Sequence, residues 1–125
     1  MNVLVETSAW IDYLRAETHN QTINSLIDDN RIVINELILT ELIPTLIIQK
    51  QSKFIALLHL LPIQPISIDW NDIRLMQTNC LKKGLNGIGI PDLILTQNAI
   101  QNHTPLYTLD KHFRLLIDIT TLKLF

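Results

Sequence analysis

Apolar and polar residues follow one another along the chain in blocks that predict strands alternating with helices. Branched residues at 3–5 predict a buried strand, and a helical pattern capped by Thr7 or Ser8 continues to Arg15. The other helical patterns cover residues 19–29, 36–50, 54–61, 69–81, 91–100 and 111–116. The other strand patterns cover residues 31–34, 66–68, 105–109 and 119–125. This order predicts a single domain over residues 1–125 with an α/β fold, in which three layers (α/β/α) surround a mostly parallel central sheet of four or five strands.

The helix predicted at 36–50 is apolar on nearly every side, so we expect other elements to cover most of it. Asn35 is placed to cap its start, and Pro44 inside it indicates either a kink or a misplaced boundary. Asp69 is placed to cap a later helix in the same way. All the glycines of the chain fall within residues 84–89, so backbone freedom is concentrated in that loop.

Composition narrows the class of protein. Hydrophobic residues make up 47% of the chain and aromatic residues only 6%, which favours helices packed around a sheet. No stretch of about 20 residues lacks both charge and proline, so a membrane span is not expected. A single cysteine and the lack of a leader-like segment predict a reducing, cytoplasmic setting. The formal charge of −2 neither favours nor excludes a nucleic-acid partner.

Acidic residues occur where the predicted elements would bring them together. Glu6 and Asp110 each end a predicted strand and precede a helix, so neighbouring strand ends would place them side by side. Asp92 opens the helix after the glycine-containing loop, and Glu41 lies in the most apolar helix, where an acid is uncommon. Glu36 is excluded because it lies roughly 140° around the helix from Glu41.

Four converging carboxylates need a cation. At separations of about 5 Å each pair would repel by roughly 3 kcal/mol at an effective dielectric constant near 20. Mg²⁺ and Mn²⁺ prefer carboxylate and water ligands, and they activate water and stabilise the leaving oxygen in phosphodiester hydrolysis. Histidines and cysteines are few, which argues against zinc.

Four segments resemble successive motifs of the PIN-domain ribonucleases, specifically the toxins of VapBC toxin–antitoxin pairs. They are residues 5–11, 41–43, 89–95 and 108–113, and the resemblance runs nearly end to end. It implies a Mg²⁺- or Mn²⁺-dependent endoribonuclease toxin that acts on structured RNA such as tRNA. It also implies a homodimer that is silenced by a cognate antitoxin.

The same resemblance assigns roles to individual residues. It implies a metal-binding and catalytic quartet of Glu6, Glu41, Asp92 and Asp110, with Ser8 and Thr108 in supporting positions. The family has Asp where this chain has Glu6, and the extra methylene moves the carboxylate by roughly 1.5 Å, whereas a misplacement near 1 Å costs about a hundredfold in rate. The metal could shift, a water could fill the gap, or the site could be weakened, naturally or by engineering. The alternative function is therefore a weakened PIN-like protein that acts by binding its antitoxin or RNA.

Simpler roles for the same acids stay open at this point. Asp92 could favour the dipole of its helix, Asp110 could cap the next helix, and Glu41 could pair with an arginine. His112 is expected on the surface beside Asp110.

Contacts with RNA and protein partners are less specific in the sequence. The basic residues that flank the motif segments, and could contact phosphates, are Arg15, Lys82, Lys83, Lys111 and Arg114. Trp10 and Tyr13 could stack on an unpaired base, although packing is the commoner role on an amphipathic helix. The apolar surplus between Leu37 and Leu61 predicts a dimer face or a groove for an antitoxin helix.

Overall fold

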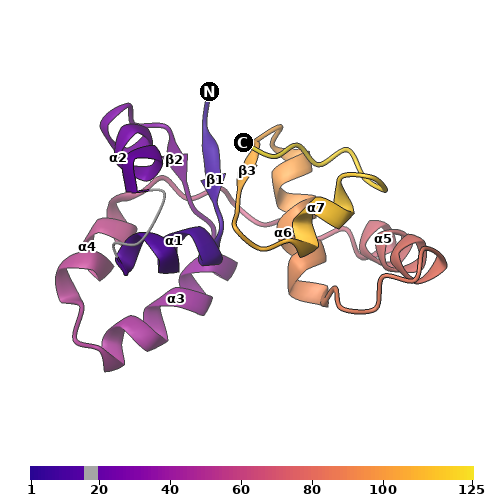
Figure 1. Cartoon of the computed structure of the whole chain (residues 1–125), viewed down its shortest axis with the longest axis horizontal. Helices are drawn as coiled ribbons and strands as arrows, with labels where there is room; N and C mark the ends of the chain where they lie inside the picture. The colour runs from indigo at the N-terminus through magenta and orange to yellow at the C-terminus, as the bar shows by residue number, and fades with distance from the viewer. Residues whose placement is uncertain (16–19) are drawn as a thin grey trace.

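A parallel sheet lies at the centre of the molecule in the computed structural model, which describes residues 1–15 and 20–125 (Figure 1). Its described strands are β1 (Val3–Val5), β2 (Ile32–Val33) and β3 (Leu106–Tyr107), in the order β2-β1-β3 with both pairs parallel. Val3 to Val5 are fully buried, as expected for a strand covered on both faces. The α/β class is therefore confirmed.

Each outer edge of the sheet carries one further parallel bridge in place of a full strand. Ile34 pairs with Ile63 beyond β2, and Leu106 pairs with Leu124 beyond β3. The prediction of a strand at 66–68 is wrong. The residue of this segment that pairs with the sheet is Ile63, a few positions earlier in the chain. The strand predicted at 119–125 shrinks to the bridge at Leu124, which is held by hydrogen bonds from Leu106 N to Lys123 O and from Phe125 N to Leu106 O.

Helices flank the sheet on both sides. They are α1 (Thr7–Leu14), α2 (Asn20–Asp28), α3 (Glu36–Ile48), α4 (Ser52–Leu60), α5 (Trp70–Lys82), α6 (Ile90–Gln101) and α7 (His112–Leu116). Figure 1 shows α1 to α4 on one side of β1 and α5 to α7 on the other. In agreement, α3 contacts α1 and α4, and α6 contacts α5 and α7. The predicted start of α2 at His19 lies outside the described residues.

Helix starts follow the predicted caps in two cases and differ in one. Asn35 accepts a hydrogen bond from Ile38 N, and Asp69 caps α5. Helix α1 starts after Glu6, so the predicted cap at Ser8 or Thr7 is wrong, and the hydroxyls of these residues contact acids instead.

Helix α3 runs on through Pro44, but it is less covered than its composition suggests. Its packing on α1 and α4 leaves Glu41, Pro44, Ile47 and Ile48 exposed. The prediction that other elements cover it on most sides is therefore wrong.

A buried network of amide side chains fixes α6 against the sheet. Asn98 Oδ1 accepts hydrogen bonds from Asn35 and Gln64, and Asn98 Nδ2 donates to Pro65 O. Thr104 donates to Gln64 Oε1. Because all the side-chain partners are buried, the network anchors the carboxyl-terminal part of α6, the helix whose first turn carries Asp92.

The helices of the described ranges include none that is both long and apolar enough to cross a membrane.

Candidate functional site

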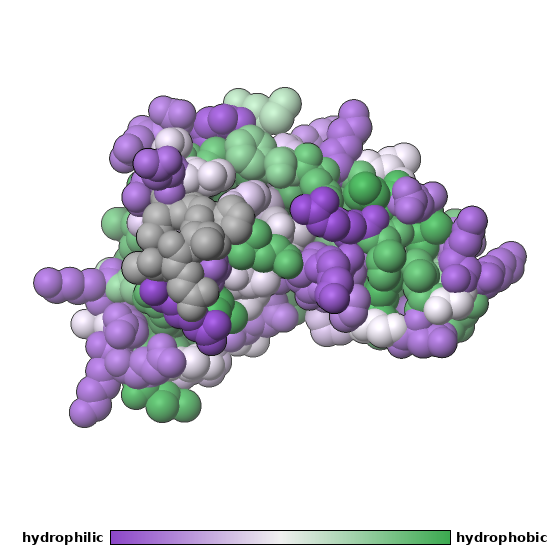
Figure 2. All heavy atoms as spheres, viewed as in Figure 1, coloured by the Kyte–Doolittle hydropathy of each residue, from purple (hydrophilic) through white to green (hydrophobic). Residues whose placement is uncertain are grey.

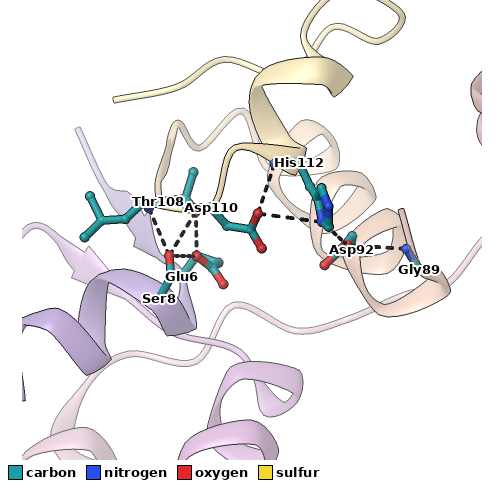
Figure 3. Close-up of polar contacts among 8 residues, drawn as sticks. Glu6, Ser8, Gly89, Asp92, Thr108, Asp110 and His112 are labelled. Atoms are coloured by element: carbon teal, nitrogen blue, oxygen red, sulfur yellow. Dashed lines mark hydrogen bonds and ion pairs between the residues drawn. The ribbon is translucent and has the colours of Figure 1, made fainter. Parts of the chain in front are cut away.

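Glu6 lies at the carboxyl end of the central strand and is only 7% exposed. Its backbone N–H donates to Tyr107 O at the end of β3, which brings residues 108–110 alongside. The hydroxyls of Ser8 and Thr108 both donate to Glu6 Oε1 at 2.5 Å (Figure 3). Burial raises the pKa of Glu6, these hydrogen bonds lower it, and the charge of Asp110 raises it. The net effect is a pKa above the ordinary value of 4.5.

Asp110 is placed by the turn between β3 and α7. Leu109 N donates to Ser8 Oγ at 2.9 Å, and Asp110 N donates to Thr108 Oγ1 at 3.0 Å. The carboxylate of Asp110 accepts a hydrogen bond from His112 N, at the first residue of α7. Ser8 and Thr108 therefore fix both the Glu6 carboxylate and the turn that carries Asp110.

Asp92 reaches the same edge of the sheet from the first turn of α6. Its Oδ2 accepts a bond from Gly89 N at 3.4 Å, in agreement with a role at the helix start. Burial raises the pKa of Asp92 and the Gly89 bond lowers it. The charge of Asp110 raises this pKa and His112 lowers it. Asp110 thus repels both of the other acids, which indicates that the three charges lie close together.

His112 lies between two of these acids, Asp110 and Asp92. The sequence predicted only its position beside Asp110. Its Nδ1 is 3.7 Å from Asp110 Oδ1 and 3.7 Å from Asp92 Oδ2 (Figure 3). The contact with Asp110 was predictable, because His112 follows Asp110 by two residues. Nothing in the local sequence signals the second contact, which depends on how α7 docks on α6.

Glu41 is exposed on α3. Its Oε1 accepts a hydrogen bond from Thr7 Oγ1 at 2.7 Å, which ties it to the residue after Glu6. Within residues 1–15 and 20–125, Glu41 makes no ion pair with an arginine and no direct contact with the other acids. The expectation that Glu41 is an acid within a covered helix is wrong, because it lies on the open side of α3.

Comparison with known proteins identifies the family. The sequence matches the PIN domain over residues 3–117, which is nearly the whole chain. This chain belongs to the PIN-domain family. The family prediction made from the four motif segments is therefore confirmed.

Solved structures agree with this assignment of the PIN domain. One similar chain comes from the crystal structure of VapBC2 from Rickettsia felis bound to a DNA fragment from its promoter. Its TM-score is 0.78 and its sequence identity is 25%. That similarity covers 100% of this chain and 98% of the other. A chain of DNA-bound VapBC from Salmonella typhimurium has a TM-score of 0.76, with coverage of 100% and 97%, but at 14% identity it shows the fold alone. No curated protein sequence matches the chain.

The donor atoms of this PIN domain are of the kind that a hard divalent cation takes. Glu6, Asp92 and Asp110 supply carboxylate oxygens, and the hydroxyls of Ser8 and Thr108 share one oxygen of Glu6, Oε1. The carboxylates of these acids lie farther apart than the ligands of a bound metal ion would. In the described part of the chain, no three acidic, histidine or cysteine side chains lie close enough together to bind one metal ion. The oxygen atoms of these residues therefore fit Mg²⁺ or Mn²⁺ by their chemistry.

The remaining candidates divide into exposed cations and packed aromatic residues. The exposed cations are Arg15, Lys82, Lys83, Lys111 and Arg114. Trp10 is fully buried and meets Tyr13 and Phe54 edge to face. Tyr13 donates to Asn24 Oδ1, so both aromatic residues pack α1 and are not free to stack on a base.

Proposed function

We propose that this PIN-domain protein is a divalent-metal-dependent endoribonuclease and the toxin of a VapBC-type pair. PIN domains of VapC-type toxins are generally nucleases that use divalent metals, and the fold match to VapBC chains supports this class. The observation that carries the proposal is the meeting of Glu6, Asp92 and Asp110 at the carboxyl edge of the sheet. They come from three separate elements, and their charges act on one another.

Each acid has a role in this proposal. A bound Mg²⁺ or Mn²⁺ supplies an activated water and charge stabilisation for the leaving oxygen. Asp92 and Asp110 are the proposed ligands on one side of the site, and Glu6 is the proposed ligand through Oε2. Glu41 is the proposed fourth acid, because Thr7 anchors it next to Glu6.

The hydroxyls of Ser8 and Thr108 orient the Glu6 carboxylate. Both donate to Oε1, so they leave the other oxygen of Glu6 to face the acids across the site (Figure 3). These bonds also stabilise the ionised form of Glu6 against its burial. Ser8 and Thr108 are therefore supporting residues that keep Glu6 charged and directed toward its ligand.

RNA is the proposed substrate, with tRNA as the first candidate. Lys111 and Arg114 are exposed on or beside α7, next to Asp110, where they could contact backbone phosphates. Arg15 lines a cavity of about 360 Å³ between α1 and α3, together with Glu41. Lys82 and Lys83 lie at the end of α5, before the loop that leads to Asp92.

An antitoxin and a second copy of the chain are the proposed protein partners. Ile47 is 61% exposed, Ile48 80% and Leu60 82%, so the apolar residues of α3 and α4 supply the surface that such a contact needs. Leu75 and Leu81 of α5 are also exposed, each at 58%. Figure 2 shows hydrophobic areas on both halves of one face with hydrophilic side chains between them.

Incubation of the purified, antitoxin-free protein with total tRNA and Mn²⁺ tests the nuclease proposal. We expect discrete cleavage products that EDTA abolishes and that the Asp92→Asn variant fails to make. Asp118→Asn is the matched control, because Asp118 is an exposed aspartate beyond α7 and makes no described contact with the site. If the protein and Asp92→Asn leave the tRNA equally intact, the nuclease proposal fails.

One observation favours the second candidate, a weakened PIN domain that acts by binding. Glu6 is longer than the aspartate of the family, and one of its oxygens is already held by two hydroxyls. Measuring RNA cleavage by the Glu6→Asp variant distinguishes the two proposed functions. The nuclease proposal expects no gain, because the shorter side chain moves away from Ser8 and Thr108. A large gain in RNA cleavage would identify a weakened natural site.

A further inference from the structure

His112 stands at the point where two elements of the proposed site meet. Its Nδ1 is 3.7 Å from Asp92 Oδ2 on α6 and 3.7 Å from Asp110 Oδ1 on the turn before α7 (Figure 3). Both distances are longer than a direct hydrogen bond, so the imidazole is centred between the two carboxylates and is not committed to one. No other described side chain contacts both acids.

The position of His112 is fixed on two sides. Its backbone N–H donates to Asp110 Oδ1 at 2.9 Å, so the residue and one of its acids move together. On the other side, a Cβ added to Gly87 would lie 3.3 Å from His112 Nε2 and 3.8 Å from Cε1. A side chain at position 87 would therefore crowd the imidazole, which a glycine does not.

We propose that His112 is a positioning residue, which orients the carboxylates of Asp92 and Asp110 on either side of the proposed cation site. The proposal rests on the proposed metal-dependent function. In this proposal His112 keeps Asp92 of α6 and Asp110 of the β3–α7 turn in a fixed position relative to one another. Gly87 takes part indirectly, since it provides the space in which the imidazole sits.

The physical reason is that carboxylate ligands need partners that orient them. Outer-shell partners that orient metal ligands commonly change metal affinity by about 10- to 100-fold when they are replaced. Asp92 has only the long bond from Gly89 N on its own helix, so His112 is its principal side-chain partner. Loss of the imidazole would leave Asp92 free to turn away from Asp110, and the two acids would repel one another.

Mn²⁺ binding, measured by calorimetry on protein freed of metal with EDTA, tests the proposal without relying on activity. We expect His112→Ala to weaken Mn²⁺ affinity by about 10- to 100-fold. His112→Asn places an amide near the position of Nδ1, so it should keep the affinity within about threefold of the original protein. Asp118→Asn should bind as the original protein does, and circular dichroism should show each variant folded.

Gly87 allows a second measurement that leaves both acids and the histidine in place. The backbone at Gly87 lies outside the left-handed region, so alanine is compatible with the chain there. The added methyl group displaces the imidazole by a few tenths of an ångström, and Gly87→Ala should therefore weaken Mn²⁺ binding. In a double-mutant cycle the same change should have no effect once His112 is alanine.

Each outcome decides between the explanations. If Mn²⁺ binds and Asp92→Asn weakens it, but His112→Ala does not, His112 does not position the acids and this inference fails alone. If His112→Ala raises the KM for RNA and leaves Mn²⁺ affinity unchanged, His112 contacts substrate instead. If the original protein binds no Mn²⁺, the proposed function and this inference fail together. If Mn²⁺ binds but RNA is not cleaved, the proposed activity fails and the calorimetry still decides the role of His112.

Discussion

Replacing Thr108 with valine removes one hydroxyl from the site and keeps the shape of the side chain. Thr108 Oγ1 donates to Glu6 Oε1 at 2.5 Å and accepts a bond from Asp110 N at 3.0 Å. A hydrogen bond to a charged group contributes about 1.5–3 kcal/mol, and a neutral one about 0.5–1.5 kcal/mol. Because both bonds are lost, the expected loss of unfolding free energy is about 2–4.5 kcal/mol when Glu6 is ionised.

The size of this loss depends on pH in a direction that the structure fixes. The bond from Thr108 lowers the pKa of Glu6, so it stabilises the ionised form more than the protonated form. Its additional contribution is present above the pKa of Glu6 and is lost as the pH falls through that pKa. The cost of Thr108→Val should thus shrink in acid to that of two neutral hydrogen bonds, about 1–3 kcal/mol.

Thermal unfolding of the two proteins between pH 4 and pH 8 measures this difference. An unfolding entropy of about 2.1 cal/mol/K per residue gives about 0.26 kcal/mol/K for a chain of 125 residues. The melting temperature of Thr108→Val should then fall by about 8–17 °C at the upper end of the pH range, and by about 4–11 °C in acid.

Thr120 provides the matched control. Its hydroxyl donates to Leu116 O and accepts a bond from Leu122 N, so its arrangement is like that of Thr108 but both partners are uncharged. Thr120→Val should cost the same at every pH in the range. If the cost of Thr108→Val is equally independent of pH, the bond to an ionised Glu6 carboxylate is refuted.

Three further predictions concern stability and the fourth acid. Burial raises the pKa of Glu6, so Glu6→Gln should melt higher than the original protein above that pKa, and the gain measured in a pH series should vanish below about pH 4.5. Asn98→Ala leaves the buried amide of Asn35 without its acceptor and Gln64 Nε2 with only its longer bond to the main-chain oxygen of residue 98, so urea unfolding should show a loss of about 3 kcal/mol or more. Glu41→Gln changes an exposed residue, so its unfolding free energy should stay within about 0.5 kcal/mol, while the initial rate of RNA cleavage falls at least about tenfold if Glu41 is a ligand.

The strand-end acids were the most predictable part of the site. Glu6 and Asp110 directly follow apolar runs, and parallel strands end at a common edge of the sheet, so sequence order alone indicates that they approach each other. Asp92 was predictable because the loop and proline before it predict the start of a helix. In each case the signal lies within a few residues of the acid.

Features that depend on packing were not predictable in this way. The alternation at 66–68 is typical of an edge strand, but the bridge forms at Ile63, where Gln64 is tied to Asn98, a residue 34 positions away. The apolar composition of α3 suggests burial all round, yet its main contacts are with α1 and α4, and Ile48 is exposed. The contact between His112 and Asp92 depends on the docking of α7 on α6, which no local pattern encodes.

The rate of tRNA cleavage as a function of Mn²⁺ concentration tests the central proposal most directly, when the protein is compared with Asp110→Asn and Asp118→Asn. Asp110 is the decisive position because its charge acts on both Glu6 and Asp92. We predict a rate that saturates with Mn²⁺, no change for Asp118→Asn, and a loss for Asp110→Asn that exceeds the 10- to 100-fold cost of removing a residue that merely orients a ligand. Cleavage that persists in EDTA, or equal rates for all three proteins, would contradict the assignment of this edge of the sheet as a metal-dependent nuclease site.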